Sequence, residues 1–232
     1  MKQLHEVQLK ILKDLLFSQS LKYSEIKPLA MENSQFVFHL DRLILESLVE
    51  KQGSTYTLTA KGKEYANKMD EEKNEVVFQA KVTAVICAIR QRGKQRDFLI
   101  YKRLKNPFYG CVGFPTEKVK WSESVAEAAT RGLKEETGLV GKPQLLAIRH
   151  YRVLTLNKKL VEDKIMHAFI FVNPTGKLEG NVEGEFTWVR ESNLKTFVNL
   201  PLEEFWEFYG AFKAFGKSGI TFKELAVITD KF

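Results

Sequence analysis

Glutamate side chains gather around a helix predicted over residues 123–137. Glu135 and Glu136 are adjacent in its last turn, and Glu123 stands at its start. Arg131 precedes Glu135 by four residues, so the two side chains share one face of the helix. Acidic groups at a helix C-terminus oppose the helix dipole, which favours a role other than a solvated helix end. Because Mg²⁺ prefers a few carboxylates together with water and substrate phosphates, the spacing predicts a divalent-metal site.

The segment that contains these residues, GFPTEKVKWSESVAEAATRGLKEETGLV at 113–140, resembles the Nudix box. The pattern of that box is G-x5-E-x7-R-E-U-x-E-E-x-G-U, where U is aliphatic. Seven of its nine defined positions carry the expected residue, namely Glu123, Arg131, Leu133, Glu135, Glu136, Gly138 and Leu139. The flanking strand-like segments agree with the family, so the resemblance covers about residues 76–215.

The resemblance implies a Nudix-type α/β/α sandwich with a mixed sheet and a phosphohydrolase of the pyrophosphatase type that uses Mg²⁺ or Mn²⁺. It implies that Glu135 and Glu136 are catalytic, and that Glu123 joins them as a metal ligand. Arg131 and Gly138 are expected to support the box. The reaction implied is attack by a metal-activated water on a phosphorus of a nucleoside diphosphate linked to another moiety.

Two box positions depart from the pattern. Glu117 stands where the box begins with glycine, in a loop that normally lets backbone approach the substrate. Gly132 replaces the glutamate that follows the arginine. A glycine inside a helix costs about 1 kcal/mol relative to alanine, so local structure does not favour it. Either space is needed at position 132, or selection on the site has relaxed.

Further site candidates lie outside the box helix. Glu179 and Glu183, in the segment 177–185, are candidates for an additional catalytic acid or base, with a solvated acidic turn as the alternative. Arg103 and Lys118 are expected to meet substrate phosphates, and Phe108 to contact a base. Surface charge and loop packing are the simpler alternatives for these three.

The first part of the chain resembles a winged helix-turn-helix domain. Helical patterns fit 4–17, 23–30 and 33–49, and the period-two segment 53–59 predicts a β-wing that Lys61-Gly62 ends before a last helix over 63–68. The string SLVEKQGSTYTLTAKGKEYA carries the resemblance. Three residues are expected on the polar face of the third helix, where base readers lie: Gln35, His39 and Arg42.

The chain is therefore expected to be α+β in class, with a winged helix-turn-helix domain at 1–70, a linker at 71–75 and a Nudix-like domain with a C-terminal helical segment at 76–232. Ser122 is the expected N-cap of the box helix, with Ser124 and Glu127 as a weaker capping pattern. Strands are expected at 77–90, 97–103, 144–155, 164–172 and 185–190 around a loop at 106–122, and an aromatic helix at 201–215 is expected in the core or at a dimer contact.

The charge and the cysteine content of the chain limit which partners and which compartment are expected. Residues 1–70 hold ten basic and nine acidic residues for a net +1, and the remainder holds 26 and 20 for +6. A balance of +1 argues against tight DNA binding, since neutralised phosphates supply most nonspecific affinity. The two cysteines, Cys87 and Cys111, lack metal-ligand spacing and are expected as free thiols in a reducing cytoplasm. Neither a signal peptide nor a membrane span is expected.

The sequence leaves two main functions open, besides a weaker third in which the N-terminal domain of an enzyme only mediates protein contacts. The first is the metal-dependent hydrolase described above, which the glutamates of the box favour. The second is a transcription regulator whose Nudix-like domain senses a nucleotide-type ligand and whose winged helix binds double-stranded DNA. The fused N-terminal domain, Gly132 and Glu117 favour this second function. A homodimer is a further expected partner.

Overall fold

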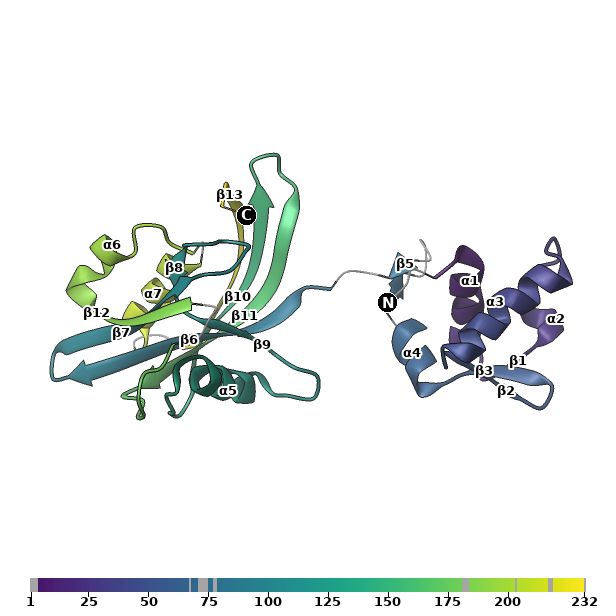
Figure 1. Cartoon of the computed structure of the whole chain (residues 1–232), viewed down its shortest axis with the longest axis horizontal. Helices are drawn as coiled ribbons and strands as arrows, with labels where there is room; N and C mark the ends of the chain where they lie inside the picture. The colour runs from purple at the N-terminus through teal and green to yellow at the C-terminus, as the bar shows by residue number, and fades with distance from the viewer. Residues whose placement is uncertain are drawn as a thin grey trace. The chain divides into compact units, whose positions relative to one another are not determined.

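The computed structural model describes residues 4–66, 68–70, 75–76, 79–180, 184–202, 204–216 and 219–231. The chain divides into two compact units, Met1–Phe78 and Gln79–Phe232, called unit 1 and unit 2 below (Figure 1). Most of the linker expected at 71–75 lies outside the described residues. Each unit has its own hydrophobic core, so each is described by itself.

Unit 1 combines short helices with a small antiparallel sheet. Its helices are α1 (Glu6–Leu16), α2 (Tyr23–Ile26), α3 (Asn33–Leu45) and α4 (Ala60–Ala66). The sheet has the order β1-β3-β2, formed by β1 (Leu21–Lys22), β3 (Thr55–Leu58) and β2 (Val49–Gln52). Two further short strands, β4 (Met69–Asp70) and β5 (Glu75–Val76), pair with each other. The apolar faces of α1 and α3 meet in a core that includes Leu12, Phe36 and Leu43.

The expected end of the hairpin at Lys61-Gly62 is wrong, because both residues lie inside α4. The reason is a close approach between two backbone segments. A Cβ atom at position 62 would collide with the carbonyl group of Leu48, so glycine lets the helix pack against the start of β2. Gly62 therefore allows close tertiary packing and does not mark the end of a secondary-structure element.

Unit 2 is built on one mixed eight-stranded sheet. Its main path is β12-β7-β6-β11-β10-β13, with β8 paired to β7 and β9 paired to β6. The pairs β6–β11 and β10–β13 are parallel, and the other pairs are antiparallel. The strands are β6 (Lys81–Arg92), β7 (Gln95–Arg103), β8 (Val112–Gly113), β9 (Thr116–Lys118), β10 (Gln144–Thr155), β11 (Leu160–Val172), β12 (Gly184–Arg190) and β13 (Thr221–Thr229).

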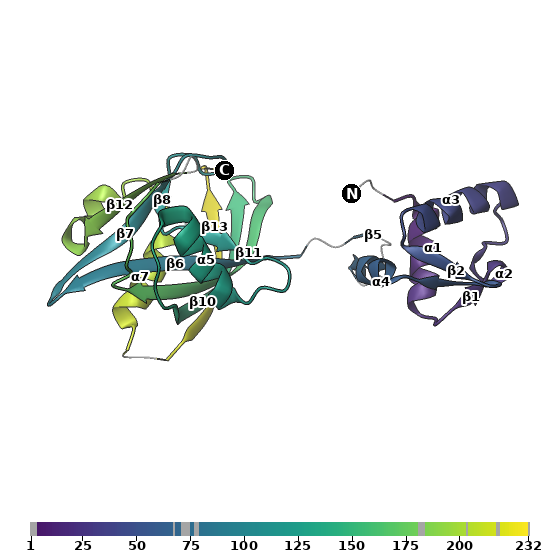
Figure 2. The same cartoon turned by 60° about the horizontal axis from the view of Figure 1, so that its bottom comes forward.

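Helices cover both faces of this sheet. Figures 1 and 2 show α5 (Val125–Thr137) on the opposite side of the sheet from α7 (Phe205–Ala214). Along β6, Ala84, Ile86 and Ala88 pack with α5, whereas Val85, Cys87 and Ile89 join the core beneath α7. A central strand that is buried on both faces has a continuous apolar sequence, and residues 84–89 form such a sequence. The mixed sheet and the α+β character that the sequence predicts are confirmed.

The C-terminal segment contains a strand in addition to the expected helix. After η1 (Glu191–Asn193), α6 (Leu194–Phe197) and α7, the chain adds β13 as a parallel edge strand beside β10. Phe205, Phe208 and Phe212 of α7 are buried in the core. A place in the core was one of the two alternatives expected for the aromatic helix. As an edge strand, β13 buries little of its surface, so its buried and exposed residues do not alternate regularly. A strand without regular alternation is not predicted from the apolar periodicity of the sequence.

Both cysteines are buried, and neither forms a disulfide. Cys87 lies in the core of the sheet, and burial raises its pKa because the thiolate is poorly solvated there. Cys111 is buried in the same core. Among the residues that the structure describes, no helix is long and apolar enough to cross a membrane.

His150 links the strands at the edge of unit 2 and makes stability there depend on pH. Its Nε2 lies 2.7 Å from Asp163 Oδ1 on β11, and its Nδ1 lies 3.3 Å from Glu224 Oε1 on β13. The hydrogen bond to Asp163, followed by that to Glu224, raises the pKa of His150. A raised pKa stabilises the fold fully below the unfolded value of about 6.5, and this stabilisation is lost as pH rises through the folded value.

We therefore expect His150→Gln to lower the melting temperature more at pH 5.5 than at pH 9, compared with the unsubstituted protein. Asp163→Asn should give the same pattern because it removes the largest cause of the shift. Thermal unfolding followed by circular dichroism at the two pH values measures the effect. An equal loss at both values would show that the charge of His150 contributes nothing.

Candidate active site

The helix α5 is held in place by caps at both ends. Ser124 is its N-cap, and Ser124 and Glu127 form a reciprocal capping box, so the expectation of Ser122 as the cap is wrong. Ser122 instead adopts a positive φ of 64° in the preceding turn. At the other end Gly138 adopts a φ of 71° and closes the helix in the left-handed conformation that glycine permits. The caps fix where the side chains of α5 point.

Arg131 of α5 gathers three glutamates around its guanidinium group. Its Nε and Nη2 donate to the two carboxylate oxygens of Glu123, at 2.7 and 2.9 Å. Its Nη1 donates to Glu135 at 3.1 Å and lies 3.3 Å from Glu117. Nη2 also donates to the carbonyl of Lys118 at 2.9 Å. This one side chain therefore ties the loop before the helix, the strand β9 and the end of the helix together.

Glu123 is the most strongly held of these carboxylates. Besides the two-point contact with Arg131, it accepts a hydrogen bond from the backbone N–H of Lys120 at 2.9 Å. The hydrogen bonds from Arg131, then that from Lys120, lower the pKa of Glu123 to about 2. A carboxylate with both oxygens engaged in this way is suited to holding the loop in shape.

Gly132 faces the side chain of Glu117. A Cβ atom at position 132 would lie 2.7 Å from Glu117 Cβ, 3.0 Å from Glu117 Cγ and 2.9 Å from Ile86 Cδ1. Such separations are too short for carbon atoms, so the space that a side chain at 132 would need is taken. Of the two explanations left open by the sequence, the need for space is the one that this geometry supports.

A cavity of about 460 Å³ opens beside β9 and the end of α5. Glu117 and Glu136 contribute carboxylates to its wall. The structure also brings Arg103, Phe108 and Lys118 to this wall, three residues that the sequence separates by up to fifteen positions. Basic side chains and carboxylates thus share one hollow.

Several lining residues were not predicted from the sequence. Lys81 of β6 and Lys164 of β11 both pair with Glu162, at 3.3 and 2.8 Å. They meet because β6 and β11 are parallel neighbours in which Lys81 lies opposite Lys164. Tyr101 and Glu204 also line the cavity. The two lysines are 83 positions apart, so no local sequence pattern predicts that they are neighbours. The register of β6 and β11 places them side by side.

The charges within the cavity influence one another. Partial burial, followed by the nearby charge of Arg103, lowers the pKa of Lys105, while Glu136 and Glu117 oppose that shift. Burial raises the pKa of Tyr101, with Glu136 adding to the effect. Both carboxylates therefore lie close enough to Lys105 to influence its pKa.

The donor set of this region suits a hard divalent cation, which takes oxygen ligands. Within the described part of the chain, no three carboxylate, imidazole or thiol groups converge closely enough to hold a metal as they stand. Glu117, Glu123 and Glu135 are instead turned toward Arg131. The side chain of Glu117 fills the space over Gly132 and lines the cavity that Glu136 also lines, so this wall offers carboxylate oxygens of the kind that a divalent cation takes.

Glu179 is the candidate acid after β11 that the structure describes. Glu179 is exposed, and its backbone N–H donates to the carbonyl of Thr137 at 3.0 Å, next to the C-cap of α5. Glu179 is not among the described residues that line the cavity. Glu183 lies outside the described residues.

The three residues expected to read DNA lie on α3 in different surroundings. Gln35 is exposed, whereas His39 stacks on His5 with ring centroids 4.4 Å apart. Arg42 pairs with Glu46 of the following turn at 3.6 Å. The same helix exposes Phe38, with 62% of its surface accessible, so the outer face of α3 is apolar as well as polar.

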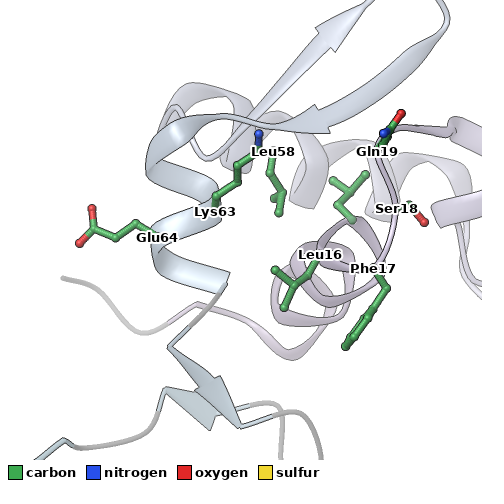
Figure 3. A pocket seen from close by; sticks show the side chains of 8 residues that line it. Leu16, Phe17, Ser18, Gln19, Leu58, Lys63 and Glu64 are labelled. Carbon is green, nitrogen blue, oxygen red and sulfur yellow. The ribbon is translucent and has the colours of Figure 1, made fainter.

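A larger hollow of about 950 Å³ lies in unit 1 at the end of α1 (Figure 3). Its lining consists of Leu16 and its neighbours, Leu58 of β3, and Lys63 and Glu64 of α4. Figure 3 shows Lys63 and Glu64 extending in different directions. One cation and one anion that do not converge offer no site for chemistry, so the cavity beside α5 is the candidate.

A family model described as the NUDIX domain matches residues 80–210, more than half of the 232-residue chain. An ADP-ribose pyrophosphatase from Methanocaldococcus jannaschii is 32% identical over 94 residues, which are 40% of this chain and 56% of that protein. The chain thus spans little more than half the length of this curated relative.

Solved structures agree on the fold. The NUDIX domain of Shewanella oneidensis NrtR, complexed with ADP ribose, superposes with a TM-score of 0.52 at 14% identity, covering 65% of this chain and 95% of that one. The MutT protein from Bacillus halodurans gives a TM-score of 0.50 at 20% identity, with 65% and 93% covered. With the family model across most of unit 2 and the box segment on α5, the chain belongs to the NUDIX domain family.

Proposed function

We propose that unit 2 hydrolyses the diphosphate of a nucleoside diphosphate linked to another moiety, with Mg²⁺ or Mn²⁺ as cofactor. The observation that carries this proposal is the cavity beside α5, which is lined by Glu117 and Glu136 together with Arg103, Lys105 and Lys118. Carboxylates bind the divalent cation, and the basic side chains bind the phosphates that share it. The name of the Methanocaldococcus relative makes ADP-ribose the first compound to test.

Each side chain has a role in this proposal. Arg103 and Lys118 bind phosphate oxygens, and Phe108 forms an apolar wall on which a base or sugar rests. Glu136 and Glu135 at the end of α5 hold the metal, and Glu136 takes the proton from the attacking water. Arg131 and Glu123 are positioning residues, because their mutual contact fixes the loop and the helix. A bound divalent cation neutralises phosphate charge and lowers the pKa of water.

Glu136 suits the role of base better than Glu179. It lines the cavity, whereas Glu179 is exposed beside the C-cap of α5. General-base catalysis requires that the base come within hydrogen-bond reach of the water it deprotonates. The acidic segment at 177–185 is therefore the secondary candidate for this role.

The test is a release assay over nucleoside triphosphates, dinucleoside polyphosphates, ADP-ribose and nucleotide sugars with Mg²⁺ or Mn²⁺. The Glu135→Gln/Glu136→Gln double variant is the blank. We expect ADP-ribose or a related compound to be cleaved into two phosphomonoesters, with the activity lost in the blank and in chelator. If no compound is hydrolysed above the blank with either metal, unit 2 is not a hydrolase of this class.

A second candidate function has its own support in unit 1. This unit has an independent core and presents an exposed face of α3 that carries Gln35 and Phe38. We propose as the alternative a regulator in which unit 1 is a winged helix that binds double-stranded DNA and unit 2 senses a nucleotide-type ligand. Electrophoretic mobility of genomic DNA fragments, with and without ADP-ribose, tests it. DNA affinity that ADP-ribose alters, without turnover, would favour the regulator.

A further inference from the structure

Two box positions have exchanged residue types in this chain. Glu117 stands at the glycine of the pattern, and Gly132 stands at the glutamate that follows Arg131. Position 117 lies on β9 and position 132 on α5, so the exchange moves a carboxylate from the helix to the neighbouring strand. The two changes leave the number of carboxylates in the box unaltered.

The structure shows that these two positions meet. The Cβ that Gly132 lacks would lie 2.7 Å from the Cβ of Glu117 and 3.0 Å from its Cγ. The aliphatic part of Glu117 therefore occupies the volume into which a side chain at 132 would extend. Each substitution makes room for the other, since two side chains cannot share that volume.

The backbone beneath Glu117 is fixed. β9 pairs antiparallel with β6, where Glu117 lies opposite Ala84. The pairing of this short strand with a central strand of unit 2 leaves Glu117 little freedom to move. The helical glycine costs about 1 kcal/mol relative to alanine, and a fixed neighbour that fills its space is a physical reason for it to persist.

The carboxylate of Glu117 is held beside Arg131 at the wall of the cavity and is largely shielded from bulk water. Only 17% of the side chain is exposed, and the group lies 3.3 Å from Arg131 Nη1. It also accepts a hydrogen bond from the backbone N–H of Lys118 at 2.9 Å. Glu117 and Glu136 line the same cavity, and both oppose the lowering of the pKa of Lys105.

We propose that Glu117 supplies, from β9, the metal-binding carboxylate that the Nudix box otherwise places on the helix at position 132, and that Glu117 joins Glu135 and Glu136 in holding the divalent cation. The inference rests on the proposed function of unit 2. It makes Gly132 the complement of Glu117 rather than a sign of a lost site. The chain's box is then complete in its ligands, with one ligand carried by a different element.

The first test is Mn²⁺ binding in the absence of substrate, measured by the electron paramagnetic resonance signal of free Mn²⁺. We expect Glu117→Gln, which keeps the shape and removes the charge, to weaken Mn²⁺ binding at least tenfold. Glu162→Gln is the matched control, because it removes a carboxylate that lines the same cavity but is paired with Lys81 and Lys164. Its Mn²⁺ affinity should stay within about threefold of that of the unsubstituted protein. Equal affinities for Glu117→Gln and Glu162→Gln would overturn the proposal.

The second test reverses the exchange. Glu117→Gly should lose Mn²⁺ affinity as Glu117→Gln does, and Gly132→Glu alone should lower the melting temperature because its side chain meets that of Glu117. The double variant Glu117→Gly/Gly132→Glu should regain at least a third of the Mn²⁺ affinity and most of the lost melting temperature. A double variant that melts like the unsubstituted protein but binds Mn²⁺ no better than Glu117→Gly would contradict the inference. The Glu117→Gln comparison stands even if the reversed protein does not fold.

The outcomes separate this inference from the proposed function. Loss of Mn²⁺ affinity in Glu117→Gln, with no compound hydrolysed by the unsubstituted protein, would support the relocated ligand and reject the hydrolase. Metal-dependent hydrolysis that Glu117→Gln leaves unchanged, with unchanged Mn²⁺ affinity, would support the hydrolase and reject the relocated ligand.

Discussion

Glu136→Gln should lower the rate of metal-dependent hydrolysis about a thousandfold, which corresponds to about 4 kcal/mol of transition-state stabilisation. The carboxylate lines the cavity, adds to the raised pKa of Tyr101 and opposes the lowered pKa of Lys105. Glutamine keeps the size of the side chain but binds a divalent cation poorly and accepts no proton from water. Steady-state hydrolysis of ADP-ribose with saturating Mg²⁺ measures the loss as a change in kcat.

The matched control is Glu64→Gln in unit 1. Glu64 is exposed, pairs with Lys68 of the same helix region at 2.8 Å and contributes nothing to the cavity beside α5. We expect its kcat to remain within twofold of that of the unsubstituted protein. A Glu136→Gln protein that folds normally and retains more than a tenth of the activity would remove Glu136 from the reaction.

Replacing Arg131 by methionine should have the second large effect, on stability and on turnover together. Arg131 contacts Glu117, Glu123 and Glu135, and its side chain is only 18% exposed. Methionine fills the aliphatic volume but leaves these carboxylates to repel one another without a cation. We expect the melting temperature of unit 2 to fall by at least about 5 °C and kcat to fall at least about a hundredfold.

The pH dependence identifies the cause of this loss. Arg131 lowers the pKa of Glu123 to about 2, below the usual value near 4.5. A lowered pKa stabilises the folded state above the unfolded value, and this contribution is lost as pH falls from about 4.5 to about 2. The difference in melting temperature between the unsubstituted protein and Arg131→Met should therefore be full at pH 6 and shrink toward pH 3.

Arg131→Lys separates charge from geometry. Lysine keeps the positive charge but lacks the planar fork that meets both oxygens of Glu123. We expect it to recover part of the stability and little of the turnover. A melting-temperature difference for Arg131→Met that does not change between pH 6 and pH 3 would show that packing, rather than the contact with Glu123, causes the loss.

Much of unit 2 follows from local sequence patterns. The strands β6, β7, β10 and β12 and the helices α5 and α7 lie close to their predicted ranges, because their apolar periodicity is strong. The departures occur where a distant partner decides. Gly62 lies within α4 because the backbone of Leu48 passes beside it, and β13 forms because β10 offers a free edge. Neither partner is near in sequence.

The sequence by itself determined the box helix and the relation of Arg131 to Glu135, because a separation of four residues sets neighbours on any α-helix. Only the tertiary structure decided that Glu117 fills the space over Gly132, since this contact joins a strand to a helix. It likewise brought Lys81 beside Lys164 across two parallel strands. Helical spacing is a local property of the chain, whereas strand register and the packing of α5 on the sheet depend on residues far apart in sequence.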